Sequence, residues 1–180
     1  MYAARLHEAS EASVPAFADE VVQRYISGVF SRALSPDIMD RRALKDEVFL
    51  RMATELSRLG TCCRLQVGAV LLRPDGGIGA AGFNGALPGM PHCTPETCRP
   101  GQRCLHTSHA EENALSFCDG QLAVAYVTHE PCLACTRSLI RRGVRRVVFA
   151  NPYVSIAAQE AEERASILAH FGVSWEQRTL

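Results

Sequence analysis

The sequence has no excess of charge of either sign and no long apolar run. Its 19 basic and 19 acidic residues give a formal net charge of zero, whereas proteins that bind long nucleic acids usually carry a basic excess. No apolar run approaches the roughly 20 residues of a membrane-spanning helix. We therefore expect neither a polynucleotide partner nor a membrane. A single nucleotide needs only a few positive groups and is not excluded.

A secretory signal is also missing, because the first residues, MYAARLHEASEAS, contain no apolar core and no cleavage signature. We therefore expect a cytoplasmic protein. In a reducing compartment, clustered cysteines bind metals more often than they form disulfides. The eight cysteines of this chain therefore predict metal binding.

Internal repeats and low-complexity segments are absent, and 180 residues suit one domain with a small appendage. Apolar residues at helical spacing predict an amphipathic helix over residues 16–34. We assign it to an N-terminal extension, residues 1–39, that packs on the main domain or on a partner subunit. A second helix is predicted over residues 40–59. Its apolar face consists of Leu44, Val48, Met52, Leu56 and Leu59.

In the main domain, residues 40–180, short apolar runs alternate with helical patterns. The turn sequence RPDGG separates the runs 66–72 and 78–83 and predicts a hairpin. Residues 84–107 contain four prolines and three glycines, which predicts a loop. Further helices are predicted over 109–118, 131–143 and 157–170, and further strands over 122–128, 145–150 and 172–177. This order predicts a three-layer α/β/α fold with a mixed five-stranded sheet.

One histidine and two cysteines stand at the starts of two predicted helices. His109 begins the first, and Cys132 and Cys135 follow Pro131 at the second. Cysteines three residues apart lie on one helix face, where the helix dipole favours their thiolates. One histidine and two cysteines leave the fourth position of a tetrahedral zinc open, which is typical of catalytic sites.

Glu111, two residues after His109, belongs to no such ligand set and can move protons between a zinc-bound water and a substrate. The pattern H-x-E followed by P-C-x-x-C is the signature of zinc nucleobase deaminases. Two alternatives stay open at this point. His129 or His106 could close a purely structural zinc site, and Glu111 could be a first-turn acid that complements the helix dipole.

These residues resemble the cytidine deaminase superfamily, and more closely its deoxycytidylate (dCMP) deaminase branch. The segments that carry the resemblance are CCRLQVGAVLL (62–72), GFNGALPGMPHC (82–93), HAEENAL (109–115) and YVTHEPCLAC (126–135). The resemblance implies a cytidine-deaminase-like fold and zinc-dependent hydrolysis of dCMP to dUMP and ammonia. It also implies a homo-oligomer, hexamer or dimer, with dCTP and dTTP as possible allosteric effectors.

The same resemblance assigns residues to the substrate. Asn84 matches an asparagine that contacts the nucleotide sugar, and Arg64 and Tyr153 are candidates near the phosphate. The base pocket would be lined by Ala110, Val67, Gly68 and Ala69. The chain departs from the family at residues 117–120, FCDG, where an arginine that binds the phosphate is expected. The family segments alone therefore do not establish that the substrate is a monophosphate.

Some members of this branch carry a second, structural zinc. Cys62 and Cys93 align with two of its ligands, and Cys98 and Cys104 would complete a four-cysteine set, with His106 as a substitute for one of them. A closed tetrahedral site would tether the long loop. The alternative is that these cysteines are reduced and unligated.

Two further functions compete with dCMP deamination. The first is deamination of another cytosine nucleoside or nucleotide, of an antibiotic nucleoside, or of adenosine in tRNA. The second is a catalytically inactive zinc-stabilised module that binds nucleotides. Glu111 disfavours this module, because a protein without turnover has no use for a proton shuttle.

Overall fold

The computed structural model describes residues 37–98, 104–153 and 158–180. Residues 44–180 form one compact unit. The helix predicted over residues 16–34 lies outside the described residues, and the division into an extension (1–39) and a deaminase domain (40–180) stays a prediction. No helix within the described ranges is both long and apolar enough to cross a membrane.

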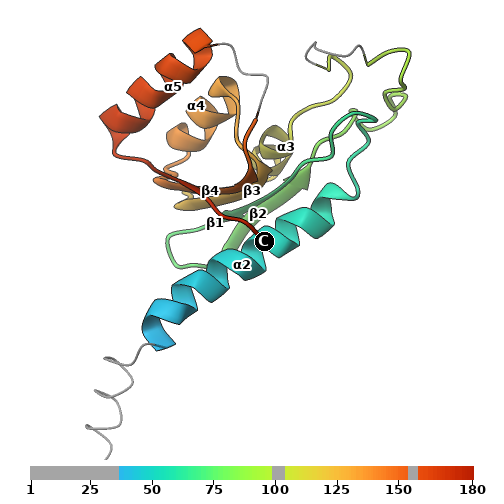
Figure 1. Cartoon of the computed structure of the whole chain (residues 1–180). Helices are drawn as coiled ribbons and strands as arrows, with labels where there is room; N and C mark the ends of the chain where they lie inside the picture. The colour runs from blue at the N-terminus through green and yellow to red at the C-terminus, as the bar shows by residue number, and fades with distance from the viewer. Residues whose placement is uncertain (1–36, 99–103, 154–157) are drawn as a thin grey trace, which may run out of the picture. The chain divides into compact units, whose positions relative to one another are not determined.

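Every helix and strand predicted from residue 40 onward is present, in the predicted order (Figure 1). The helices are α2 (Asp37–Ser57), α3 (Ala110–Ser116), α4 (Leu133–Arg141) and α5 (Ala158–Phe171), and the strands are β1 (Gly68–Leu72), β2 (Ile78–Phe83), β3 (Val124–His129), β4 (Arg146–Asn151) and β5 (Ser174–Gln177).

The strands form one mixed sheet in the order β2-β1-β3-β4-β5. β1 runs antiparallel to both β2 and β3, whereas β3, β4 and β5 are parallel. Helices α3, α4 and α5 cover one face, and α2 lies on the other (Figure 1). The predicted three-layer fold with a mixed five-stranded sheet is confirmed.

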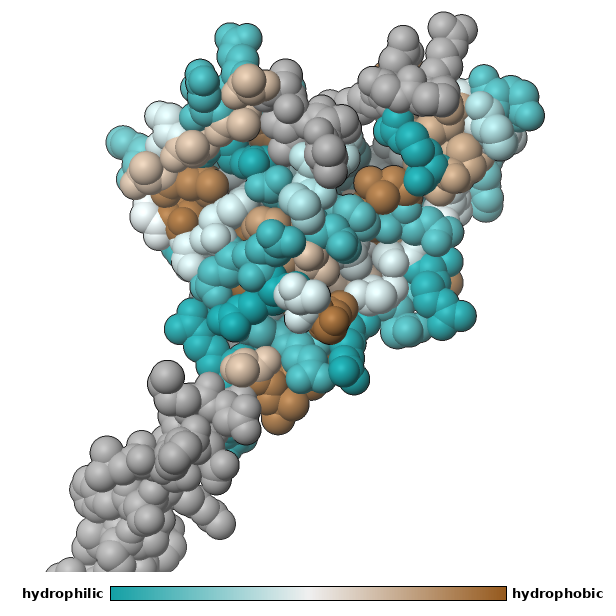
Figure 2. Space-filling view, viewed as in Figure 1, coloured by the Kyte–Doolittle hydropathy of each residue, from teal (hydrophilic) through white to brown (hydrophobic). Residues whose placement is uncertain are grey.

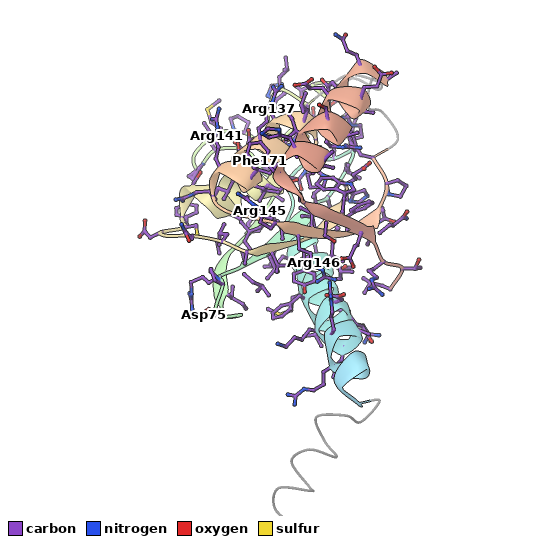
Figure 3. All side chains as sticks on the ribbon, turned by 90° about the vertical axis from the view of Figure 1, so that its left-hand side faces the viewer. Asp75, Arg137, Arg141, Arg145, Arg146 and Phe171 are labelled. Atoms are coloured by element: carbon purple, nitrogen blue, oxygen red, sulfur yellow. The ribbon has the colours of Figure 1, made fainter. Side chains whose placement is uncertain are left out.

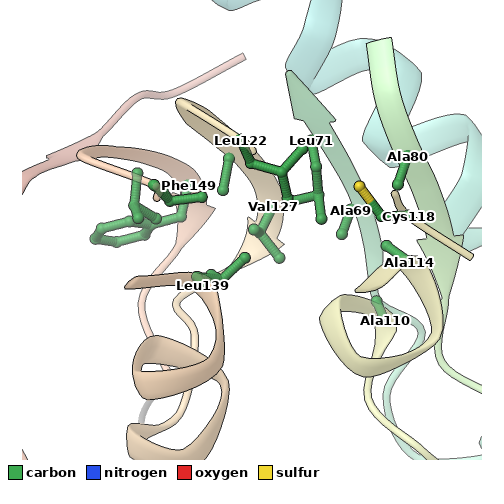
Figure 4. Close-up of a cluster of buried hydrophobic side chains, with 13 residues drawn as sticks. Ala69, Leu71, Ala80, Ala110, Ala114, Cys118, Leu122, Val127, Leu139 and Phe149 are labelled. Atoms are coloured by element: carbon green, nitrogen blue, oxygen red, sulfur yellow. The ribbon is translucent and has the colours of Figure 1, made fainter. Parts of the chain in front are cut away.

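Two hydrophobic cores result, one on each face of the sheet. In β1, Ala69 and Leu71 face α3 and α4, whereas Val70 and Leu72 face α2, because successive side chains of a strand point to opposite faces. Figure 4 shows the larger core, in which Leu71, Val127, Leu139 and Phe149 gather between the sheet and the helices. Both cores hold the helix N-termini at fixed positions on the sheet.

Two glycines let helices approach the sheet closely. A Cβ at Gly68 would lie 1.9 Å from the carbonyl oxygen of Ala53 in α2, and one at Gly82 would lie 2.6 Å from the backbone nitrogen of Ala114 in α3. Any side chain would push these helices outward. Gly68 of β1 and Gly82 of β2 therefore set the distances at which α2 and α3 pack on the sheet.

The apolar face predicted for α2 is mostly exposed. Leu44, Val48 and Leu59 are 45–58% exposed and Met52 is 36% exposed, whereas Leu50 and Ala53 make the buried contact with the sheet. The periodicity is correct for a helix, but this helix is apolar on two sides. Periodicity alone does not reveal which side meets the core.

A buried charge cluster fixes α2 to the far strands of the sheet. Arg146 of β4 donates two hydrogen bonds to Asp46 of α2, at 2.8 and 2.6 Å, and two to Glu176 of β5, both at 2.9 Å. The Tyr126 hydroxyl also donates to Asp46, at 2.8 Å. Figure 3 shows Arg146 on the α2 side of the sheet, apart from Arg137, Arg141 and Arg145 near α4 and α5. The cluster joins α2, β3, β4 and β5.

Candidate active site

The candidate site lies where α3 and α4 begin. His109 is the residue that caps the N-terminus of α3, and Cys132 caps α4. Parallel strands β3 and β4 end at the same edge of the sheet, which is where ligands bind in open α/β sheets. His129 ends β3, and the chain passes through Pro131 directly into α4. The fold therefore brings two segments that are 23 residues apart in sequence to one point.

Two interactions hold α3 in place and explain polar residues next to His109. The Glu112 carboxylate accepts a hydrogen bond from the His109 backbone N–H, at 2.9 Å, and forms a capping box. The Asn113 side chain donates to the carbonyl of Phe83, at 2.7 Å, and ties the helix to β2. Both interactions fix the direction in which His109 points.

The donor atoms of His109, Cys132 and Cys135 converge within 4.8 Å of one another. His109 Nδ1 lies 3.6 Å from Cys132 Sγ and 3.3 Å from Cys135 Sγ. In a tetrahedral zinc site, ordinary bond lengths separate a nitrogen and a sulfur ligand by about 3.6 Å. The three donors therefore fit a zinc ion, and they leave its fourth position to a ligand that is not part of this group.

The two thiols differ in their acidity. A hydrogen bond from Cys135 and another from His109 lower the pKa of Cys132 well below its ordinary value, and the same thiol pair raises the pKa of Cys135. The two sulfurs thus hold one proton between them before a metal displaces it. Metal binding at this site would release that proton, because a cysteine ligand binds as thiolate.

Glu111 lies in the first turn of α3 and is only 3% exposed. Burial raises the pKa of this carboxyl to about 7. The hydrogen bond from its own backbone N–H and the charge of His109 lower the pKa, but by less than burial raises it. A bound dication would lower it again. A carboxyl that titrates near neutral pH can both accept and donate a proton.

A cavity of about 60 Å³ opens onto these residues. It is lined by five of the residues expected at the substrate, by Glu111 and by four of the metal-binding candidates, Cys62, Cys104, His109 and Cys132. The five are Arg64, Val67, Asn84, Ala110 and Tyr153. Gly68 and Ala69 do not line it. Ala69 is fully buried in the core, and the Gly68 backbone N–H donates to the Thr128 hydroxyl.

Asn84 lines the cavity and also holds one of its walls. Its side-chain oxygen accepts from the Val67 N–H and its amide donates to the Leu65 carbonyl, both at 2.7 Å. One N–H and one lone pair remain for a ligand. Asn84 therefore orders the segment that contains Arg64, in addition to any contact with a sugar.

The structure adds four lining residues that the sequence analysis did not assign to the substrate: Leu65, Thr107, His129 and Glu130. The Glu130 carboxylate accepts from Arg164 at 2.7 Å, from the Trp175 indole at 3.0 Å and from the Tyr153 backbone at 3.3 Å. Because α5 and β5 supply two of these donors, no local motif could have indicated the role of Glu130. It joins the cavity wall to the C-terminal elements.

The second cysteine cluster also assembles. The sulfurs of Cys62, Cys93, Cys98 and Cys104 lie within 4.8 Å of one another. Cys93 Sγ also accepts a hydrogen bond from the Cys63 backbone N–H, at 3.2 Å. Among the described residues, neither donor group includes His106 or His129. Four thiols and no histidine match a closed tetrahedral zinc site.

Residues of both donor groups line the same cavity. Cys62 and Cys104 line the same cavity as His109 and Cys132. Burial opposes ionisation of Cys104, yet hydrogen bonds from Thr107, His106 and the neighbouring thiols lower the pKa of Cys104 to about 7. At least one thiol of the second group is therefore ready to bind a metal at neutral pH.

Comparison with known proteins decides the family. Residues 44–151 match the model of the cytidine and deoxycytidylate deaminase zinc-binding region. The chain belongs to this family. Its enzymes are hydrolytic deaminases, and the match spans both donor groups and Glu111. The sequence-based identification of the family is confirmed.

Relatives in the family carry different names. The chain is 37% identical over 131 residues to ComE operon protein 2 of Bacillus subtilis, a match that covers 68% of each chain. It is 38% identical over 122 residues to the deoxycytidylate deaminase of Mycobacterium phage D29, covering 58% of this chain and 92% of the phage protein. The dCMP deaminase of cyanophage S-TIM5, solved with dCMP and dUMP, superposes with a TM-score of 0.60 at 26% identity, covering 80% of this chain and 98% of that one.

Proposed function

We propose that this chain hydrolyses dCMP to dUMP and ammonia, with a zinc ion held by His109, Cys132 and Cys135. The observation that carries this proposal is the convergence of their three donor atoms on the cavity in which the Glu111 carboxyl is buried. A structural zinc site needs neither an open fourth position nor a buried acid beside it.

Zinc bound there would supply a water whose pKa is near 7 and hence a nucleophile at neutral pH. Glu111 would take one proton from that water as its oxygen bonds to C4 of the cytosine ring, and would deliver this proton to N3. It would then move the remaining proton of the added hydroxyl to the amine, which leaves as ammonia when the C4–N bond breaks. The N-terminal turn of α3 holds His109 and Glu111 two residues apart, so that both face the same space. The surrounding walls bind the base and exclude bulk water.

Three observations support a nucleotide as substrate. Arg64 and Tyr153 line the cavity, and a guanidinium and a phenol can both bind a phosphate. The relative from Mycobacterium phage D29 is named a deoxycytidylate deaminase. The cyanophage structure contains dCMP and dUMP. We therefore assign Arg64 to the phosphate and Asn84 to the sugar.

The substrate assay uses purified zinc-loaded protein with dCMP, CMP, deoxycytidine, cytidine and a tRNA anticodon arm. We expect dCMP to be deaminated with the highest kcat/KM. Arg64→Met should raise KM for dCMP by about tenfold or more, as expected for loss of a charged contact, and leave KM for deoxycytidine unchanged. Turnover of another substrate with dCMP untouched would refute the assignment.

The second candidate function is deamination of a different cytosine nucleoside or nucleotide. It is favoured by residues 117–120, which contain no arginine, and by the similarity to ComE operon protein 2. The same assay separates the two functions. Equal kcat/KM for dCMP and deoxycytidine would favour the second.

We further propose that Cys62, Cys93, Cys98 and Cys104 hold a second, structural zinc. Metal analysis should then find about two zinc ions per chain. Cys98→Ser should leave one, whereas Cys63→Ser should leave both, because Cys63 is the adjacent exposed cysteine outside the group. One zinc per chain in the unmodified protein would refute the second site.

A further inference from the structure

Cys63 is an exposed thiol that belongs to neither proposed zinc site. Three thiols of the neighbouring group, Cys62, Cys93 and Cys98, are buried. The space-filling view shows the loop after β2, which carries Cys93, at the surface on the upper right, with hydrophilic and hydrophobic residues intermixed (Figure 2). Because the susceptibility of a cysteine to oxidation follows its exposure, a small oxidant in solution reaches Cys63 more readily than the buried thiols.

Cys93 places one of those buried sulfurs next to Cys63. The two sulfurs lie 3.7 Å apart, and the Cys63 backbone N–H donates a hydrogen bond to Cys93 Sγ at 3.2 Å. A movement of about 2 Å would bring the sulfurs to disulfide distance. Cys62 is a poorer partner for Cys63, because consecutive Cα atoms are about 3.8 Å apart and disulfides usually span about 4.4–6.8 Å between Cα atoms. The geometry therefore favours Cys93.

We propose that Cys63 and Cys93 form a reversible disulfide when a peroxide oxidises this protein, and that the disulfide releases the second zinc ion. This inference rests on the proposed four-cysteine zinc site. Once Cys93 is bonded to Cys63, that group retains three thiolates, which are too few for a closed tetrahedral site. The pair therefore makes metal binding at this site sensitive to oxidation.

The oxidation takes two steps and transfers two electrons from the sulfurs to the peroxide. The Cys63 sulfur bonds to one oxygen of hydrogen peroxide as the O–O bond breaks, and the other oxygen takes the thiol proton and leaves as water. The Cys93 thiolate then bonds to the Cys63 sulfur as the S–O bond of the sulfenic acid breaks. The departing hydroxide takes a proton from solvent and becomes the second water. A phosphine or thiol reductant returns the two electrons and restores both thiols.

The consequence reaches the substrate cavity, because the second group forms part of its wall. Cys62 and Cys104 line this cavity, and Arg64, which we assign to the phosphate, directly follows Cys63. A bound metal would tether the segment that contains Arg64 to the loop after β2, and oxidation removes that tether. We therefore expect the oxidised protein to bind dCMP more weakly and to show a higher KM.

The test treats the full-length, zinc-loaded protein with a small excess of hydrogen peroxide. Mass spectrometry of protease fragments identifies the disulfide, and a metallochromic dye measures the released zinc. We expect a pair of peptides linked through Cys63 and Cys93 and the release of about one zinc ion per chain. Reduction with a phosphine, followed by added zinc, should restore the starting zinc content. Recovery distinguishes a disulfide from a sulfinic acid, which such reductants do not reverse.

Cys63→Ser is the decisive variant, because serine keeps the size of the side chain and cannot form a disulfide. It should retain both zinc ions and release zinc about tenfold more slowly, or slower still, at the same peroxide concentration. Cys118→Ala is the matched control, because it removes a buried thiol outside both donor groups and should respond as wild type does. Circular dichroism confirms that each variant is folded.

The peptide map separates this inference from the proposals on which it rests. Zinc analysis before oxidation decides the four-cysteine site, and the dCMP assay decides the reaction, whereas the linked peptide is detected independently of both. Oxidised wild type without the peptide that links Cys63 to Cys93 overturns the proposal. Wild-type rates of zinc release from Cys63→Ser also overturn it, and so does a linked peptide in protein that keeps all its zinc.

Discussion

Glu111 is a buried acid close to His109 and Cys132, and its neighbour Glu112 is an acid with a different task. Replacing it with glutamine keeps the size and removes the titrating group. We expect Glu111→Gln to lower kcat by about 10²–10⁴-fold and to retain zinc, measured by elemental analysis. Glu112→Gln is the matched control, because glutamine also serves in a capping box. A kcat within about tenfold of wild type in Glu111→Gln would remove this residue from proton transfer.

Asn84 combines two roles that substitution can separate. In Asn84→Asp an oxygen replaces the amide that donates to the Leu65 carbonyl, so two acceptors face each other. We expect the free energy of unfolding to fall by about 1–3 kcal/mol and KM to rise, measured by urea titration and steady-state kinetics.

Asn113→Asp is the control for this prediction. Asn113 also donates to a backbone carbonyl, that of Phe83, but it does not line the cavity. This variant should lose comparable stability while KM changes little. Equal changes in KM for both variants would mean that Asn84 acts through folding alone.

At the level of elements, the cluster around Arg146 predicts a pH-dependent stability. Hydrogen bonds from Arg146 lower the pKa of Glu176 to about 2. Burial alone would raise the pKa of Asp46, but hydrogen bonds from Arg146 and Tyr126 lower it overall. A lowered carboxyl pKa stabilises the fold above the unfolded-state value, and this stabilisation is lost as the pH falls through the folded-state value.

We therefore expect Arg146→Met to reduce the free energy of unfolding by about 3 kcal/mol near pH 7, because it leaves the Asp46 carboxylate buried without its cation. The difference from wild type should shrink as the pH falls from about 5 toward 2, measured by urea unfolding. Arg178→Met removes a half-exposed arginine from the same acids and should cost less than about 1 kcal/mol. A difference that is constant with pH would contradict the assigned charges.

The elements also show what sequence can and cannot predict. Each helix and strand from residue 40 onward follows from periodicity and turn residues, and Cys132 and Cys135 follow from spacing on a helix. The orientation of α2 does not follow, because Leu44 and Leu50 are equally apolar and only the sheet selects between them. The role of Glu130 depends on Arg164 and Trp175, which tertiary contacts bring to it.

Substrate residues were harder to predict than metal ligands for a similar reason. Three donors at two helix starts are fixed by local geometry. In contrast, the cavity wall depends on where β1 begins: Val67, just before the strand, lines the cavity, whereas Ala69, inside the strand, is buried in the core. Residues two positions apart therefore receive different roles that no motif distinguishes.

At the scale of the whole molecule, the two proposed metal sites beside one cavity predict that metal binding stabilises the fold. A zinc ion that binds only the folded state adds several kcal/mol to the free energy of unfolding at saturation. We expect a chelator to lower Tm by about 10 °C or more and added zinc to restore it, measured by scanning calorimetry. Glu111→Gln should respond as wild type does. A Tm that chelation leaves unchanged would contradict both metal sites.

Asn84 precedes Gly85, and asparagine followed by glycine is the pair in which the next backbone nitrogen most readily attacks the side-chain amide. In the folded chain that nitrogen donates to the Ser108 carbonyl, and the Asn84 amide is held at both ends, so the ring-closing geometry is blocked. Unfolding removes this protection. Each excursion to the unfolded state therefore exposes Asn84 to conversion into an aspartate that can no longer donate to Leu65. Deamidation of this one residue therefore limits the lifetime of the protein at high temperature. Measurements of equilibrium stability do not detect this limit.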